Sequence, residues 1–188
     1  MSFQEDFIHG YKKYENNFNK WCERASTILG KVTQCGIVET DKDGYGLIAI
    51  NRPDFGEEYI DKEHYTIDRH MTYSEIPVEG FKTQCSNEGI QFMQSNEKSL
   101  YGKKFDLWYG FTYTEKINDN IQRQYYFGSD TPEIYDNLVN QSSLVKKLIQ
   151  YFKQENETII NYYRDRKFKI SEHTMSHGEP RAKAKSPK

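Results

Sequence analysis

The chain has few cysteines, few prolines and no long apolar run. Its 188 residues include 3 cysteines and 5 prolines. The cysteines (Cys22, Cys35 and Cys85) are odd in number and widely spaced, and none lies in a C-x-x-C motif, so a disulfide framework is not expected and a reducing cytosol fits best. No run approaches the length of a membrane span, and the N-terminus lacks the apolar region of a signal peptide. We therefore expect a cytoplasmic protein with no membrane partner.

The chain also lacks an excess of charge of either sign. Lysine and arginine number 26 against 28 aspartates and glutamates, for a net charge of −2. A nucleic-acid-binding domain usually shows a basic surplus or a basic stripe. The charge balance therefore gives no reason to expect nucleic acid as a partner.

Apolar residues are scarce too, but aromatic residues are not. The hydrophobic fraction is 36% and the mean hydropathy is −0.93, values that alone would suggest disorder. However, 15 tyrosines, 11 phenylalanines and 2 tryptophans supply a large area for burial. We predict one folded domain over residues 1–165 with a core of Phe and Tyr. The polar, basic end, residues 166–188, is predicted to be a disordered tail or linker remnant.

The first half shows helical spacing followed by a hairpin. Residues 5–29 carry apolar side chains at steps of three and four, which predicts one or two amphipathic helices. Strands are predicted at 34–40 and 47–51, on either side of the turn DKDGYG. A helix is expected from Pro53 to about Glu63, with Asn51 available as its cap.

The second half also contains a hairpin with helices before and after it. Its predicted elements are an irregular segment at 66–81 with a possible short strand near 81–84, a helix at 87–98, strands at 105–114 and 121–129, and helices at 132–140 and 142–163. Two hairpins separated by helices indicate an antiparallel sheet with helices on its faces. The predicted fold class is α+β, a PAS-like α/β/α sandwich with an antiparallel sheet flanked by helices.

The stretch from Pro53 to Phe81 is the strongest candidate for a binding site. It gathers Phe55, Tyr59, Tyr65, Asp68 and Phe81 into one short block, with a single carboxylate among the rings. That composition suits a pocket that holds an apolar ligand and fixes one of its polar groups. In the alternative interpretation, the rings are core residues on a helix face and Asp68 binds local backbone.

The spacing of three of these residues resembles a motif of the ligand-sensing domain of LuxR-type (quorum-sensing) transcriptional regulators. The motif has an aromatic residue, then Tyr four positions later and Asp nine positions after that, as in Phe55, Tyr59 and Asp68. A later segment, GFTYTEK followed by RQYYFGSDTPEIYDNLVNQSSLVKK, is similar to orphan members from gammaproteobacteria. The resemblance covers roughly residues 10–165. The family has Trp where this chain has Phe55, and a second Trp near the position of Phe81.

The resemblance implies a non-enzymatic sensory domain with a cavity between the sheet and one helical layer. It implies that Tyr59 contacts an acyl carbonyl and that Asp68 accepts an amide N–H. Phe55 has no donor and cannot bind a lactone carbonyl as the family's Trp does, which argues against an acyl-homoserine lactone and leaves open a different ligand or none. The 25 residues after Tyr163 cannot build the family's helix-turn-helix domain, so no direct DNA binding by this chain is expected.

Two aromatic residues outside this block are further candidates for the ligand site. Trp108 shares its side of the strand with small Gly110 and Thr112, which leave room for a ligand or let a helix pack close. Tyr126 falls near the place where the resemblance puts a ligand-contacting hydroxyl.

Two other functions stay open at this point. One is a ligand-free interaction module that forms a heterodimer with a full-length regulator; the apolar stripe of helix 142–163 would also suit a homodimer. The other, weaker alternative is a small-molecule enzyme on a PAS-like scaffold, with His64 or His70 beside a carboxylate. Their His-x5-His spacing does not place two imidazoles on one metal, and no nucleophile or phosphate-loop motif occurs. We expect no catalysis, metal or cofactor.

Overall fold

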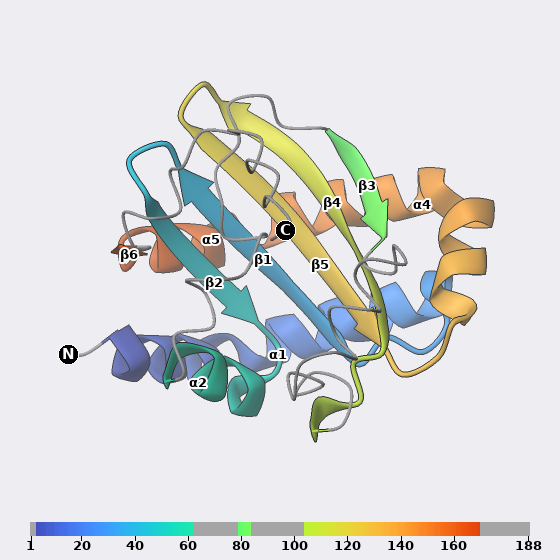
Figure 1. Ribbon diagram of the computed structural model, residues 1–188, viewed down its shortest axis with the longest axis horizontal. Helices are drawn as coiled ribbons and strands as arrows, with labels where there is room; N and C mark the ends of the chain where they lie inside the picture. The colour runs from blue at the N-terminus through green and yellow to red at the C-terminus, as the bar shows by residue number, and fades with distance from the viewer. Residues whose placement is uncertain (1–2, 62–78, 84–103, 170–188) are drawn as a thin grey trace, which may run out of the picture.

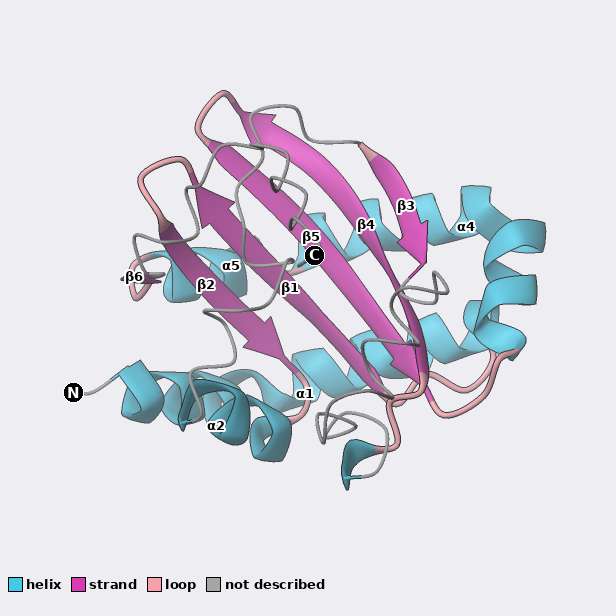
Figure 2. Cartoon of the chain, in the orientation of Figure 1, coloured by secondary structure: helices cyan, strands magenta, loops and turns pink. Residues whose placement is uncertain are grey.

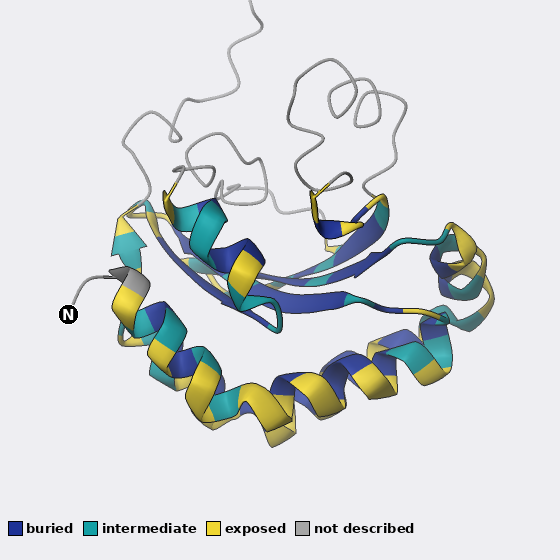
Figure 3. Cartoon of the chain, turned by 90° about the horizontal axis from the view of Figure 1, so that it is seen from below, coloured by how far each residue is buried: buried dark blue, intermediate teal, exposed yellow. Residues whose placement is uncertain are grey.

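The computed structural model describes residues 3–61, 79–83 and 104–169. These residues form a six-stranded antiparallel sheet in the order β3-β4-β5-β1-β2-β6 (Figures 1 and 2). Helices α1, α4 and α5 cover one face of the sheet, and α2 lies on the opposite side (Figure 3). The predicted α+β class, an antiparallel sheet flanked by helices, is confirmed.

Two hairpins build the centre of the sheet. The first joins β1 (Gln34–Asp41) to β2 (Tyr45–Ile50), and the second joins β4 (Tyr109–Asn118) to β5 (Ile121–Ser129). The first turn needs Gly44, whose φ of 80° lies in the left-handed region that glycine adopts most readily. Antiparallel pairing of β1 with β5 unites the two hairpins.

Short strands form both edges of the sheet. Strand β3 (Gly80–Thr83) pairs with β4, close to the predicted short strand, and β6 (Phe168–Lys169) pairs with β2. Strand β6 extends the paired sheet beyond residue 165. The expected helix at 87–98 lies outside the described residues.

The helical layer consists of α1 (Phe3–Leu29), α4 (Glu133–Glu155) and α5 (Glu157–Arg164). Trp21 of α1 joins this layer to the sheet, because its ring stacks on Phe152 with centroids 3.6 Å apart and meets Phe127 edge-on at 5.5 Å. The break expected between 140 and 142 is a kink at Gln141 inside α4, and a second break at Asn156 separates α4 from α5.

Helix α2 (Pro53–Asp61) docks on α1 through a glycine. A Cβ added to Gly56 would lie 2.2 Å from Cζ of Phe7, so the Phe7 ring occupies the space that any larger residue would need. The prediction that Asn51 caps this helix is wrong, because its side-chain oxygen binds a different backbone group. Asn51 Oδ1 accepts the backbone N–H of Cys35 at 2.9 Å instead, which ties the end of β2 to β1.

Strand β4 begins later than predicted. Residues 105–108 are not part of a strand, and Asp106 has a positive φ of 53°, a conformation that Asp tolerates better than most residues. This change of backbone direction at Asp106 reverses the side to which the preceding residues point. Phe105 and Leu107 therefore do not share a face with Phe111, whereas the alternating pattern predicts that they do. Both side chains are buried on the side of the sheet opposite the helical layer, where Phe105 meets Phe55 of α2 and Leu107 lies above Gly128.

Candidate functional site

The face of the sheet opposite the helical layer is polar and buried. Residues that pair across neighbouring strands share a face, and the register pairs Thr112 with Tyr126, Thr114 with Gln124, and Thr40 with Gln122. We call the six buried polar side chains of this side the polar face: Gln34, Thr40, Thr112, Thr114, Gln122 and Gln124. None is more than 8% exposed. Thr and Gln side chains are mostly exposed in folded proteins, so a group of six buried ones is unusual.

Three atoms of the polar face find no hydrogen-bond partner among the residues that the structure describes. They are Oε1 of Gln34, Oγ1 of Thr40 and Oγ1 of Thr112. A buried polar atom without a partner costs about 1–3 kcal/mol, and such atoms are few in folded proteins. Among the three, Thr112 of β4 is the one that pairs directly with Tyr126 of β5.

Tyr126 lies flat along this face because its neighbour is a glycine. A Cβ added to Gly128 would lie 2.8 Å from the Tyr126 hydroxyl and 2.9 Å from Cδ2 of Leu107. The phenol and the Leu107 side chain therefore meet above Gly128. Gly128 pairs with Gly110, two residues before Thr112 on β4, so this contact lies one step along the sheet from the unpartnered Thr112 oxygen.

A row of three aromatic rings, from Phe105, Phe55 and Tyr59, extends from Leu107 to α2. Phe105, two residues before Leu107, meets the Phe55 ring edge-on with centroids 5.2 Å apart, and Phe55 stacks on Tyr59 at 5.7 Å. Arg52 lies over the Phe105 ring at 5.6 Å and binds Asp54 through two hydrogen bonds of 2.7 and 2.9 Å. Those hydrogen bonds from the Arg52 guanidinium hold the pKa of the Asp54 carboxyl below its usual range.

The structure brings together some of the residues expected at the site and separates others. Phe55 and Tyr59 lie side by side and are buried, and Tyr126 lies on the side of the polar face. Phe81 lies on the other face, where it contacts Phe111 at 5.8 Å and has the Lys146 ammonium 5.9 Å from its ring. Trp108 is 42% exposed. Tyr65 and Asp68, like His64 and His70, lie outside the described residues.

Sequence reasoning missed the polar face and its apolar neighbour Leu107. The signal was present, because polar residues alternate at Thr112 and Thr114 and again at Gln122 and Gln124. Read along one strand, such alternation indicates a solvent-facing side. Only the register shows that the two alternations meet on one face, and only the burial shows that this face is covered.

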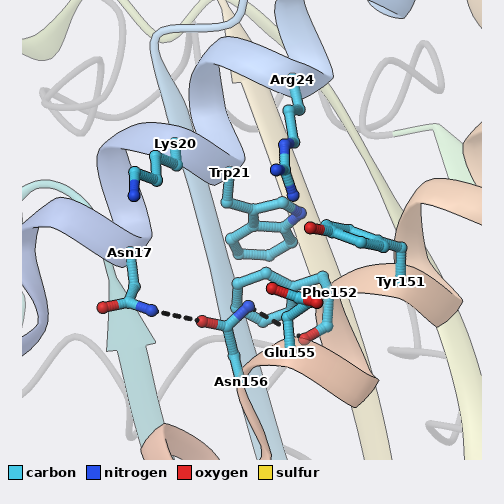
Figure 4. Close-up of a pocket in the computed structure, with 8 residues that line it drawn as sticks. All are labelled: Asn17, Lys20, Trp21, Arg24, Tyr151, Phe152, Glu155 and Asn156. Atoms are coloured by element: carbon cyan, nitrogen blue, oxygen red, sulfur yellow. Dashed lines mark hydrogen bonds between the residues drawn. The ribbon is translucent and has the colours of Figure 1, made fainter.

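A cavity of about 110 Å³ lies elsewhere, between α1 and α4. Its lining residues are drawn in Figure 4: Asn17, Lys20, Trp21, Arg24, Tyr151, Phe152, Glu155 and Asn156. Arg24 lies over the Tyr151 ring at 4.3 Å, and Asn17 donates a hydrogen bond to Asn156 at 3.1 Å. Small-molecule pockets usually enclose roughly 300–1,000 Å³. This space is smaller and lies on the helical side, so we place the candidate site at the polar face.

Within residues 3–61, 79–83 and 104–169, no three His, Cys, Asp or Glu side chains gather closely enough to hold a metal ion. No helix in the same ranges is long and apolar enough to cross a membrane.

Comparison with known proteins gives a structural match. No protein-family model matches the chain, and no curated protein sequence matches it. The fold is similar to the crystal structure of the VqsR ligand-binding domain (LBD) from Pseudomonas aeruginosa, with a TM-score of 0.52 and 14% sequence identity. The match covers 80% of this chain and 95% of that chain. At this identity the similarity establishes the fold.

Proposed function

We propose that this chain is a cytoplasmic sensory domain of the LuxR type that binds a small, mostly apolar signal molecule against the polar face. The observation that carries the proposal is the buried Thr112 hydroxyl, which lies beside Tyr126 without a partner among the described residues. A ligand's hydrogen-bonding group would remove the cost of that unsatisfied oxygen. Its apolar part would lie against Leu107, Phe105 and Phe55.

The fold supports this proposal. VqsR is a LuxR-type regulator, and the matching structure is its ligand-binding domain. In the proposed site, Tyr59, Tyr65 and Asp68 are additional polar anchors, and Trp108 is an outer wall. Phe81, which contacts Phe111 on the helical side of the sheet, is not part of this site. Control of transcription would pass through a DNA-binding part that is separate from these residues.

Binding would act through stability. A ligand that binds only the folded state adds about 2.7 kcal/mol to the free energy of unfolding at one hundred times its dissociation constant. That addition favours the folded sensory domain, and any dimer built from it, whenever the signal is present.

The test is thermal unfolding of the protein with and without a panel of acyl-homoserine lactones and a bacterial lipid extract. The key variant is Thr112→Val, which removes the unpartnered hydroxyl and keeps the shape of the side chain. Without additive, we expect this variant to unfold at a midpoint equal to or above that of wild type, because a buried unsatisfied oxygen is gone. With the active additive, its shift should be at least halved. Asp68→Asn should weaken the shift as well.

Thr83→Val is the matched control, because Thr83 is an exposed strand residue on β3. It should keep the full ligand-dependent shift. A shift that is equal in Thr112→Val and wild type would refute the site at the polar face. No shift with any additive would favour the second candidate function.

The second candidate is an interaction module that pairs with a full-length regulator or with its own copy. Leu144 and Tyr151 of α4, two turns apart on one side of the helix, are 44% and 37% exposed. Large exposed apolar side chains on one helix face favour protein contacts. Sedimentation velocity over a range of concentrations tests self-association, and a Leu144→Asp variant should abolish any dimer. If the protein sedimented as a monomer at every concentration, self-association would be excluded and only pairing with a full-length regulator would remain.

A further inference from the structure

We propose that Cys22 and Cys35 form a reversible disulfide that joins α1 to β1. The two sulfur atoms lie 2.8 Å apart in the folded protein, although thirteen positions separate them in the chain. A disulfide bond is about 2.0 Å long, so less than one ångström of movement brings the sulfurs to bonding distance. This modification is independent of the proposed sensory function.

The surroundings hold the two thiols in this position. Asn51 donates from Nδ2 to the Cys22 sulfur at 3.2 Å, and its Oδ1 accepts the Cys35 backbone N–H at 2.9 Å. The Asn51 backbone N–H also donates to the Cys35 carbonyl at 3.1 Å. One side chain therefore fixes both cysteines, and it lies two residues before α2 begins.

The oxidant is a small disulfide such as oxidised glutathione. Cys22 is 9% exposed and Cys35 is fully buried, so Cys22 meets the oxidant first. The Cys22 thiolate attacks one sulfur of oxidised glutathione, forms a mixed disulfide and releases one glutathione thiolate. The Cys35 thiolate then attacks the Cys22 sulfur and displaces the second glutathione. Two protein thiols are oxidised, and one oxidised glutathione is reduced to two thiols.

Burial sets the rate of the second step. Burial and the neighbouring Cys22 raise the pKa of the Cys35 thiol well above its ordinary value, and only the thiolate is a nucleophile. The attack of Cys35 on the mixed disulfide is therefore slow in the folded protein. The alternative is that both cysteines are permanently reduced and act as small apolar core residues.

The test compares oxidation of the folded and unfolded protein. Cys85→Ser protein, which keeps only this pair, is equilibrated with mixtures of reduced and oxidised glutathione, in buffer and in concentrated guanidinium chloride. After acid quenching and thiol blocking, trypsin releases Cys22 in WCER (residues 21–24) and Cys35 in VTQCGIVETDK (residues 32–42). Mass spectrometry then measures the fraction of these two peptides that is cross-linked.

We expect the folded protein to reach half cross-linking at a ratio of oxidised to reduced glutathione at least about tenfold lower than the unfolded chain, because the fold already holds the sulfurs together. The cross-linked protein should also unfold at a higher temperature, and dithiothreitol should reverse that rise. If half cross-linking needed the same glutathione ratio in buffer and in guanidinium chloride, the proposal would be overturned. Glutathione bound to Cys22 without transfer to Cys35 would overturn it as well.

Discussion

Arg123 of β5 donates from Nε to Glu39 of β1 at 2.6 Å, in the centre of the sheet and on its helical side. Their side chains are only 4% and 5% exposed. Arg164 of α5 binds the same carboxylate at 2.9 Å and 3.1 Å, and Arg123 also donates to the Tyr125 hydroxyl at 3.1 Å. Since the Glu39 carboxylate holds two strands and a helix at once, it fixes both the register of the sheet and the position of α5.

Replacing this carboxylate should be costly. In Glu39→Gln, the two guanidinium groups lose their shared negative charge, and the buried Arg123 keeps only the carboxylate of Glu115, 3.7 Å away. We therefore expect the free energy of unfolding to fall by up to about 3–5 kcal/mol. Urea unfolding followed by circular dichroism measures the change. Asp119→Asn is the control: it removes the carboxylate of an exposed ion pair with Lys116 and should leave the urea midpoint unchanged. A loss below about 1 kcal/mol in Glu39→Gln would contradict the central role of the carboxylate.

The contact between α1 and α2 gives a second prediction. Glycine to alanine inside a helix usually stabilises a protein by about 0.5–1 kcal/mol, but a Cβ at Gly56 would lie 2.2 Å from the Phe7 ring. We therefore expect Gly56→Ala to destabilise the protein by about 1–3 kcal/mol. It should also weaken any ligand-dependent shift, because α2 carries Phe55 and Tyr59. Asp61→Ala, an exposed change on the same helix, should do neither, and a stabilised Gly56→Ala protein would disprove the contact.

The buried phenol of Tyr163 predicts alkaline instability. Burial raises the pKa of Tyr163 above its ordinary value near 10, and its hydroxyl lies 3.5 Å from the Phe7 carbonyl oxygen. Above pH 10 the unfolded chain releases this proton while the folded protein keeps it. The free energy of unfolding therefore falls as pH rises from about 10 towards the folded pKa, by up to about 1.4 kcal/mol per pH unit for one group.

Tyr163→Phe removes this group and should flatten the fall. Urea unfolding midpoints between about pH 9 and pH 11 compare the two slopes. Part of the slope should persist in the variant, because burial raises the pKa of Tyr125 as well. Identical slopes in the variant and wild type would show that Tyr163 ionises equally in both states.

The hairpins were predictable because local patterns determine them. The turn around Gly44 and the alternation in 121–129 need no knowledge of the rest of the chain. The kink at Gln141 was also close to a predicted break. In contrast, the reversal at Asp106 depends on tertiary packing of Phe105 against Phe55, which no local pattern encodes. The late start of β4 therefore could not be predicted.

The candidate site was only partly predictable for the same reason. The neighbouring positions of Phe55 and Tyr59 follow from helical spacing, since residues four apart lie on one face. The pairing of Thr112 with Tyr126 requires the register between β4 and β5, and the approach of Cys22 to Cys35 requires the position of α1 on the sheet. These relationships appear only when distant segments pack together.

The pairing of β1 with β5 has a consequence for synthesis of the chain. Glu39 and Arg123 are 84 positions apart, and Thr33 and Gly128 are 95 apart. On the ribosome, the first hairpin emerges long before its neighbour, so one side of β1 waits with unpaired backbone groups until β5 is made. Sheets that depend on such distant partners fold slowly and are open to misassembly meanwhile. A polypeptide that stops before Ile121 would expose that strand edge permanently and should aggregate.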